Sequence, residues 1–373
     1  MSCQSGRRFG VRYARDQKRR DNSAFKSSTL STIKARRPRR LYLVPMLIPA
    51  ELAMSPRLKS WPLGGRLVTR CCGLGPVKTA VVHPCDAVAI ESAAEAADLG
   101  LIEPVLVGPE LKIRAAAAAA GIDISRFLLI STPHSHASAE RSIEMARDGQ
   151  VQLLMKGSIH TDELMHAVLA AKTGLRTQRR VSHVYLMQTP AYPKPLLITD
   201  GAINIAPGLE DKRDIVQNAI DLAHVLGIDQ PKVAILSAVE TVTSRLPSTI
   251  HAAALCKMAD RHQITGGLID GPLAFDNAVN PAAAAEKGIV SSVAGDADVL
   301  VAPDLIAGNI LAKQLTFLGG AEAAGLVLGA RVPIILTSRA DSERVHVVSC
   351  ALAVLMAEKL GIIARRPTTS AHG

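Results

Sequence analysis

The feature of this chain that most constrains its fold is a regular alternation of short apolar runs and helical periods, which begins near Thr79. Each run has four or five residues, and most runs are followed by small and apolar residues at helical spacing. Strands that alternate with helices predict a parallel sheet with helices on both faces. We predict strands at 79–83, 104–107, 127–130, 151–154, 184–187, 196–199, 232–236, 267–270, 298–302 and 333–336, and helices at 86–99, 111–120, 137–147, 209–226, 248–261 and 342–360.

Composition agrees with such a sheet and locates the charge of the chain. Apolar residues make up 48% and aromatic residues only 3%, a balance that suits buried strands under Ala-rich helices. The net charge of +10 belongs to residues 1–40, which hold 13 Lys and Arg but only two Asp and Glu. The remaining residues hold 30 Lys and Arg and 31 Asp and Glu. The body of the chain is therefore neutral, and we predict no nucleic-acid partner.

The basic N-terminal segment, up to about residue 60, shows no apolar period. Its abundance of Arg and Ser is typical of a transit peptide. A disordered basic tail explains the composition as well, and so does translated upstream sequence with the true start at Met46 or Met54. We predict a disordered extension over residues 1–60.

Cysteine usage and hydropathy predict the compartment. The six cysteines form no CxxC pair and have no histidine cluster nearby, so we expect neither zinc nor a disulfide framework. The best membrane candidate, residues 41–54, is short and carries Pro45, Pro49 and Glu51. We therefore predict a reducing, cytoplasmic location and no contact with a membrane.

Lys156-Gly157-Ser158 is the first segment with possible chemistry. It follows the predicted strand at 151–154 and precedes a helix that begins near Thr161. Ligands of open α/β sheets bind beyond the carboxyl ends of the strands, and a helix N-terminus offers free N–H groups to an anion. The segment therefore predicts an anion site, although a tight turn alone would explain it.

Two further segments place polar residues after predicted strands. Asp270 ends a strand, and Gly271-Pro272 predicts a turn there. Asn309 and Lys313 lie one helical turn apart on the same face, where they suit an anionic or amide-bearing ligand. A capping aspartate and a solvated helix face are equally good interpretations.

Thr337-Ser338-Arg339 is the sharpest local feature. It follows the strand at 333–336 and directly precedes the last predicted helix. A hydroxyl and a guanidinium fork at this edge suit a phosphate or an acyl phosphate.

Taken in order, these segments resemble the phosphate acetyltransferase and phosphate butyryltransferase family, over about residues 80–362. The segments at 174–176, 182–184 and 338–342 look closest to the butyryl branch. The matching pieces are Lys156-Gly157 with Thr161, Ser182-His183, residues 199–204, residues 233–237, residues 270–273, residues 293–295 with 297–301, residues 307–310 with Lys313, and Ser338-Arg339.

The resemblance implies an α/β, isocitrate/isopropylmalate-dehydrogenase-like fold of two α/β domains with a cleft between them. We predict the first domain over 61–195 and 331–363, the second over 196–330, and a tail over 364–373. The resemblance also implies a homodimer that binds acyl-CoA and inorganic phosphate, with no metal and no bound cofactor.

The resemblance further implies the site. Ser338 and Arg339 would bind phosphate and the charge that develops on the reacting carbonyl. Asp341 is the nearest acid, and it either caps the last helix or takes the proton of the CoA thiol. The predicted substrate-binding residues are Lys156, Thr161, Arg176, Ser182, His183, Ser237, Asp270, Asn309 and Lys313.

Two positions depart from the acetyl branch of the family. Val345 stands where that branch usually has an aspartate, and His166 stands where it often has an arginine. These departures favour butyryl-like or broader acyl substrates. Two alternatives stay open, an NAD(P)-dependent dehydrogenase of the same fold and a non-catalytic ligand sensor.

Overall fold

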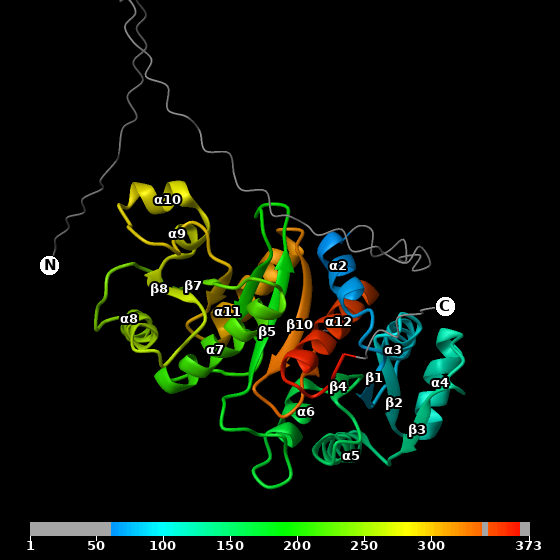
Figure 1. The fold of residues 1–373 in the computed structure, drawn as a ribbon. Coiled ribbons are helices and arrows are strands. Elements are labelled where there is room, and N and C mark those ends of the chain that lie inside the picture. Colours follow the sequence, from blue (N-terminus) through cyan, green and yellow to red (C-terminus); the bar gives the residue numbers. More distant parts are fainter. Residues whose placement is uncertain (1–60, 338–341, 366–373) are drawn as a thin grey trace, which may run out of the picture. The chain divides into compact units, whose positions relative to one another are not determined.

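The computed structural model describes residues 61–337 and 342–365 (Figure 1). The predicted extension, the predicted catalytic residues Ser338, Arg339 and Asp341, and most of the predicted tail lie outside the described residues. The helices are α2 (Pro62–Arg70), α3 (Ala87–Asp98), α4 (Glu110–Ala120), α5 (Ser135–Arg147), α6 (Thr161–Val168), α7 (Leu209–Val225), α8 (Pro247–Asp260), α9 (Phe275–Val279), α10 (Pro281–Glu286), α11 (Leu305–Phe317) and α12 (Glu343–Lys359). The strands are β1 (Val77–Val82), β2 (Ile102–Gly108), β3 (Leu128–Ser131), β4 (Leu153–Lys156), β5 (Ser182–Gln188), β6 (Leu196–Thr199), β7 (Lys232–Leu236), β8 (Leu268–Leu273), β9 (Val299–Val301), β10 (Glu322–Leu328) and β11 (Ile334–Ile335).

These strands form one sheet in the order β3-β2-β1-β4-β11-β10-β5-β6-β9-β7-β8. The five strands at one end and the four at the other run parallel within each group, as predicted. The centre differs, because β10 runs antiparallel to both β11 and β5, and β5 runs antiparallel to β6. The expectation of a wholly parallel sheet is therefore wrong, because it did not include β10 or the reversal of β5.

Side chains alternate between the two faces of the sheet, and helices cover both. Along β4, Leu153 and Met155 pack in a cluster with α3 and α12, while Leu154 packs in a second cluster with α5 and α6. At the other end of the sheet, α7 and α8 cover one face and α9 and α11 the other. The predicted covering of both faces is confirmed.

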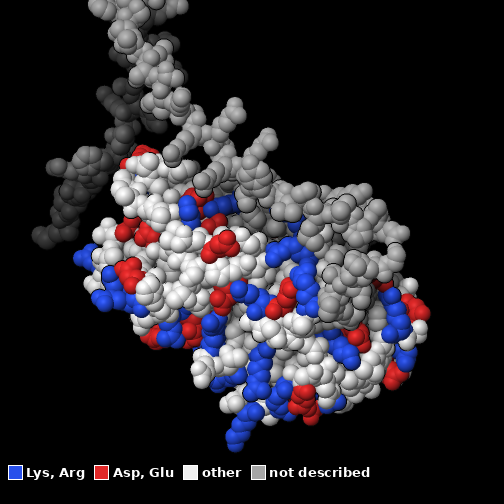
Figure 2. All heavy atoms as spheres, viewed as in Figure 1, with Lys and Arg blue, Asp and Glu red and all other residues white. Residues whose placement is uncertain are grey.

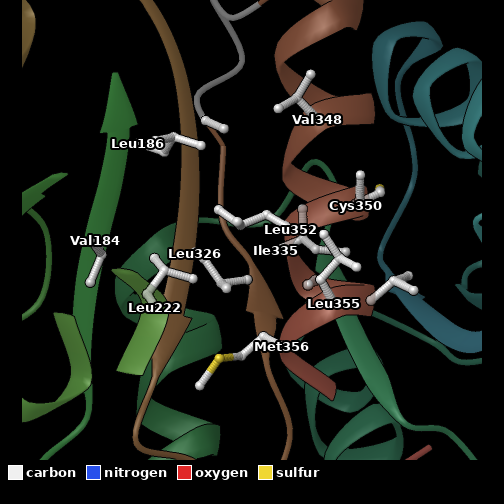
Figure 3. Packing of buried hydrophobic residues seen from close by; sticks show 14 of the residues in the cluster. Val184, Leu186, Leu222, Leu326, Ile335, Val348, Cys350, Leu352, Leu355 and Met356 are labelled. Atoms are coloured by element: carbon white, nitrogen blue, oxygen red, sulfur yellow. The ribbon is translucent and has the colours of Figure 1, made fainter. Parts of the chain in front are cut away.

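The last helix, α12, lies between the central strands and helices α2 and α3 (Figure 1). Its residues Leu352 and Met356 point toward Leu326 of β10 and Ile335 of β11 (Figure 3), and Leu355 belongs to the same cluster. Each of these helix side chains is at most 3% exposed. A buried side chain of this size contributes about 1.5–3 kcal/mol, so α12 is a main source of stability at the middle of the sheet.

The described residues belong to one compact unit. The antiparallel pair β5–β10 lies in the middle of the sheet, so the predicted boundaries at 195 and 331 place neighbouring central strands in different domains. The division into two α/β domains stays a prediction.

Acidic and basic side chains are interspersed across much of the face shown in Figure 2. Among the described residues, no helix has both the length and the hydropathy to cross a bilayer.

Candidate active site

A cavity of about 450 Å³ lies where β4 and β11 end and α6 and α12 begin, and α11 forms its opposite wall. Four of the predicted substrate-binding residues line it together. Two lysines and no carboxylate are found among its described lining residues, so the cavity is electropositive. The lining residues are Lys156, Ile159, His160, Thr161, Tyr185, Gly201, Ala202, Leu305, Asn309, Ala312, Lys313, Thr316, Phe317, Ala323, Ala324, Gly325, Leu336, Thr337 and Val345.

The first wall is built by two parallel strands that end side by side. Met155 of β4 is paired with Ile335 of β11, so Lys156 and Leu336 leave the sheet as neighbours. Lys156 is only 8% exposed although it carries a charge. Gly157 follows, and a Cβ there would stand 2.6 Å from the carbonyl oxygen of Val82. The close approach of the chain to β1 therefore requires glycine and turns Lys156 toward the cavity.

The second wall is the N-terminal half of α11. Asp304 caps this helix, and its carboxylate accepts a hydrogen bond of 2.9 Å from the backbone N–H of Ala307. Gly308 lies against the turn after β6, where a Cβ would collide with the carbonyl oxygen of Asp200. Asn309 then reaches the carbonyl of Gly201 with its side-chain amide, at 2.9 Å.

Asn309 and Lys313 are one turn apart on α11, as their spacing predicted, and the structure places both in the lining of the cavity. The Asn309 side chain is half-buried, whereas Lys313 is exposed. Thr161 faces them as the first residue of α6. The two lysines thus come from opposite walls of the same cavity.

The other described residues of the predicted site do not line this cavity. Ser182 is buried and accepts a hydrogen bond of 2.8 Å from Asn218 of α7. His183 is fully buried below the cavity floor, packed against Gly325 and 4.2 Å from the ring of Tyr185, both of which line the cavity. Neither of these two predicted residues lines the cavity.

Arg176 and Ser237 line separate cavities. Arg176 is exposed in a cavity of about 400 Å³ that also includes Arg179 and Arg213. Ser237 lines an apolar cavity of about 730 Å³ on another side of α11, and its hydroxyl lies 2.8 Å from that of Ser248. Their predicted roles would need ligand groups that extend well beyond the first cavity.

Asp270 lies within β8 and does not end it, so the predicted turn at Gly271-Pro272 is wrong. Its carboxylate accepts a hydrogen bond of 2.8 Å from the N–H of Gly271. The pairing of β8 with β7 shifts by one residue between Asp270 and Leu273. Such a bulge on an edge strand accommodates proline, which has no N–H to donate.

The segment that carries Ser338, Arg339 and Asp341 lies outside the described residues, but both of its flanks are described. Thr337 and Val345 line the cavity on either side of it. The described chain thus lines the cavity at the residue before this segment and again in the first turn of α12.

One feature of the site was not predicted from the sequence, a hydrogen bond of 2.9 Å between the Thr337 hydroxyl and Nδ1 of His346. His346 is the fourth residue of α12 and is 5% exposed. Burial lowers its pKa to about 4, with a further contribution from the ammonium group of Lys156. The only signal in the sequence is one polar residue within the apolar run 345–348.

Among the described residues, no group of three or more His, Cys, Asp or Glu side chains is arranged to hold a metal ion. The described lining of the cavity offers an ammonium pair, an amide and hydroxyls instead. An electropositive cavity beyond the carboxyl ends of strands in an α/β sheet defines an anion-binding site of the kind that α/β enzymes use.

Comparisons with known proteins identify the family. The family model described as "Phosphate acetyl/butaryl transferase" matches residues 137–354. The chain is 60% identical to a phosphate acetyltransferase of Rhizobium meliloti over 294 residues, 79% of this chain and 93% of that protein. It is 38% identical to a phosphate butyryltransferase of Clostridium acetobutylicum over 280 residues, 75% of this chain and 93% of that protein.

Solved structures of phosphotransacylases have a fold similar to that of this chain. The chain resembles a branched-chain phosphotransacylase from Enterococcus faecalis V583 with a TM-score of 0.65 and 29% identity, over 75% of this chain and 98% of that one. A phosphotransacetylase from Streptococcus pyogenes has the same fold, with a TM-score of 0.69, 24% identity, and coverage of 82% and 99%. The chain therefore belongs to the phosphate acetyltransferase and phosphate butyryltransferase family.

Proposed function

We propose that this chain is a phosphate acyltransferase, which moves a short acyl group reversibly between coenzyme A and inorganic phosphate. The observation that carries the proposal is the electropositive cavity, which Lys156 and Lys313 both line with no carboxylate among the described lining residues. Relatives named phosphate acetyltransferase or butyryltransferase, at 37–60% identity, support the same activity and do not favour the dehydrogenase alternative.

The reaction explains why such a cavity needs cations. A phosphate oxygen attacks the thioester carbonyl, the C–S bond breaks, and the CoA thiolate leaves. The tetrahedral intermediate places an oxyanion beside a phosphate, so two negative charges crowd one site. Lys156 on one wall and Lys313 on the other would offset that charge, and both substrates held in line would react without a covalent acyl-enzyme.

We assign Ser338 and Arg339 to the phosphate, since Thr337, which directly precedes them, lines this cavity. Asn309 suits the amide-bearing arm of coenzyme A, because its amide N–H is engaged by Gly201 and its carbonyl oxygen remains to accept. Asp341 remains a proposal in two forms, a helix cap or the acceptor of the thiol proton.

Acetyl and butyryl groups are both proposed substrates. Relatives named as acetyltransferases range from 41% to 60% identity and those named as butyryltransferases from 37% to 45%, whereas the motifs at 174–184 and 338–342 looked nearest the butyryl branch. Val345 lines the cavity and would add apolar surface where the acetyl branch has an acid. We further propose that the active form is a homodimer.

The test is release of CoA thiol from acetyl-, propionyl- and butyryl-CoA by the purified chain, with and without phosphate. We expect release that depends on phosphate, and its rate for each thioester measures the chain-length preference. Thiol release that is the same without phosphate would contradict the proposed function.

An Arg339→Lys variant tests the assigned phosphate ligand. It keeps the charge but loses the bidentate fork. We expect a higher KM for phosphate and a large fall in rate with an unchanged melting temperature, and wild-type kinetics would remove Arg339 from the site.

A further inference from the structure

The pair formed by Thr337 and His346 has no role in the reaction described so far. Thr337 is the last described residue before the segment 338–341, and it lines the cavity next to Leu336. Its hydroxyl oxygen lies 2.9 Å from Nδ1 of His346, which comes from the first turn of α12. One hydrogen bond thus joins the end of β11 to the start of α12 at the cavity wall.

The surroundings of His346 keep its ring neutral. The side chain is 5% exposed, and the group that raises its pKa, Asp86, has less effect than burial and the ammonium of Lys156, which lower it. An imidazole in this state cannot hold a catalytic proton at neutral pH, so His346 is a poor general base. His346 can therefore act on the cavity only through the direction of its hydrogen bond to Thr337.

The direction of the hydrogen bond between His346 and Thr337 follows from the state of the other ring nitrogen, Nε2. Nε2 of His346 is buried and has no hydrogen-bond partner among the described residues. Buried N–H donors without an acceptor are rarer in proteins than acceptors without a donor. The positive charge of Lys156 also favours a lone pair over a proton on that nitrogen. The proton therefore resides on Nδ1, which donates to the Thr337 hydroxyl oxygen.

With Nδ1 as the donor, the Thr337 hydroxyl keeps its own proton for another partner. Lys156 lies on the neighbouring strand end, since Met155 and Ile335 are paired in the sheet. A hydroxyl donor and an ammonium group on adjacent strand ends are complementary to the oxygens of a phosphoryl group.

We propose that Thr337 donates a hydrogen bond to a phosphoryl oxygen of inorganic phosphate or of the acyl phosphate, and that His346 is a positioning residue which orients the Thr337 hydroxyl. The inference rests on the proposed function of the cavity and adds two residues to it. It assigns His346 no proton transfer and no contact with the substrate.

Threonine variants test the hydroxyl. Thr337→Val keeps the shape of the side chain and removes the donor, and Thr337→Ser keeps the donor. A hydrogen bond to a charged group is worth about 1.5–3 kcal/mol, which predicts a rise in the phosphate KM of about 10- to 100-fold for Thr337→Val. The KM for acetyl-CoA should stay unchanged, and Thr337→Ser should remain within about threefold of the wild type.

Histidine variants test the orientation. Asparagine places an amide N–H close to the position of Nδ1, so His346→Asn should retain phosphate binding. His346→Leu removes the donor and should raise the phosphate KM by about 2- to 12-fold, as for a neutral hydrogen bond. Protection by inorganic phosphate against thermal unfolding gives a second readout that does not depend on turnover. Thr337→Ala replaces Thr337→Val if the valine variant does not fold.

The outcomes separate this inference from the proposed function. If the wild-type protein shows no phosphate-dependent acyl transfer, that result would overturn the proposed function itself. If the wild type is active, a normal phosphate KM in Thr337→Val would overturn the role of the hydroxyl. A rise in the phosphate KM that is as large in Thr337→Ser as in Thr337→Val would overturn it as well. Equal losses in His346→Asn and His346→Leu would show that the imidazole acts through packing and not through its N–H.

Discussion

The side-chain amide of Asn309 donates a hydrogen bond of 2.9 Å to the backbone carbonyl of Gly201, which ties α11 to the turn after β6. The two segments are 108 residues apart in the sequence. Gly308 makes this bond possible, since the helix backbone there lies directly against Asp200. The position of Lys313 at the cavity therefore depends on a contact that is built from two glycines and one amide.

The first prediction concerns that contact. A methyl group at Gly308 would collide with the Asp200 carbonyl, so Gly308→Ala should move α11 away from the turn and lower stability by about 1–3 kcal/mol. We expect a strong loss of acyl transfer as well. Gly288→Ala is the control, because its Cβ meets nothing within 4 Å and only its positive φ of 66° is strained. The control should lose stability of about 1–2 kcal/mol yet keep its rate; equal activity in the two variants would contradict the prediction.

The second prediction separates a ligand-facing lysine from a solvated one. Lys313→Gln removes a cation from the cavity, and we expect KM for the anionic substrates to rise about tenfold, consistent with one charge-assisted interaction. Lys359→Gln is the matched control at the far end of α12, where the side chain is exposed. Steady-state kinetics at two salt concentrations should show a weaker salt dependence of KM in Lys313→Gln alone. Identical kinetics in both variants would show that Lys313 serves only as a solvated surface charge.

The third prediction links Lys156 to His346. The Lys156 ammonium lowers the pKa of His346, so Lys156→Met should raise that pKa above its present value of about 4. The measurement is a titration of the His346 ring by NMR in both proteins. The variant should also lose at least about a hundredfold in turnover, as expected when one electrostatic donor is removed from a preorganised site. An unchanged titration would place the two groups too far apart to interact.

The fourth prediction is a pH dependence of stability. Burial lowers the pKa of both His183 and His346 to about 4, while their ordinary value is about 6.5. The unfolded chain therefore binds more protons than the native protein in the window between these values. The free energy of unfolding should fall as pH drops from about 6.5 to 4, by up to about 1.4 kcal/mol per pH unit for each histidine.

Denaturant titrations at several pH values measure this dependence. His346→Asn removes one of the two buried imidazoles and should make the fall shallower in that window. A profile that is identical in the variant and the wild type would show that His346 is not the group that takes up a proton on unfolding.

Local pattern was enough to predict most elements of this fold. The alternation from Thr79 onward gave helices and strands whose positions agree with the structure to within a few residues, because each apolar run or helical face is a property of neighbouring residues. The same holds for the turn at Lys156-Gly157 and for the shared face of Asn309 and Lys313. These features depend on spacing that the sequence displays directly.

Strand β10 could not be predicted in this way. Its sequence contains Ala323, Ala324 and Gly325, residue types with low strand propensity. Gly325 is required because a Cβ there would stand 2.5 Å from the carbonyl oxygen of Leu336 and 2.8 Å from Nε2 of His183. The reason for the glycine lies in segments far away in the sequence, so only the folded chain reveals it.

The site was predicted in part for a related reason. Lys156, Thr161, Asn309 and Lys313 come together because they follow strand ends or share a helix face that can be inferred from local pattern. Arg176 lies outside the cavity, since its place depends on an antiparallel bridge to Ala330, which follows the unpredicted strand β10. His346 was missed because a single polar residue in a buried helix has no periodic signature.

The pairing of β11 with β4 has a consequence for how the enzyme is made. Ile334 contacts Leu154 across a separation of 180 residues, and α12 then covers the sheet beside them. Contacts so distant in sequence form slowly during folding, because a long loop must close before they contribute. A chain still growing on the ribosome would hold Lys156 at an unpaired strand edge, without β11 to complete that wall of the cavity. Binding competence would therefore arise only after synthesis of the final helix, so that incomplete chains would not bind the substrate.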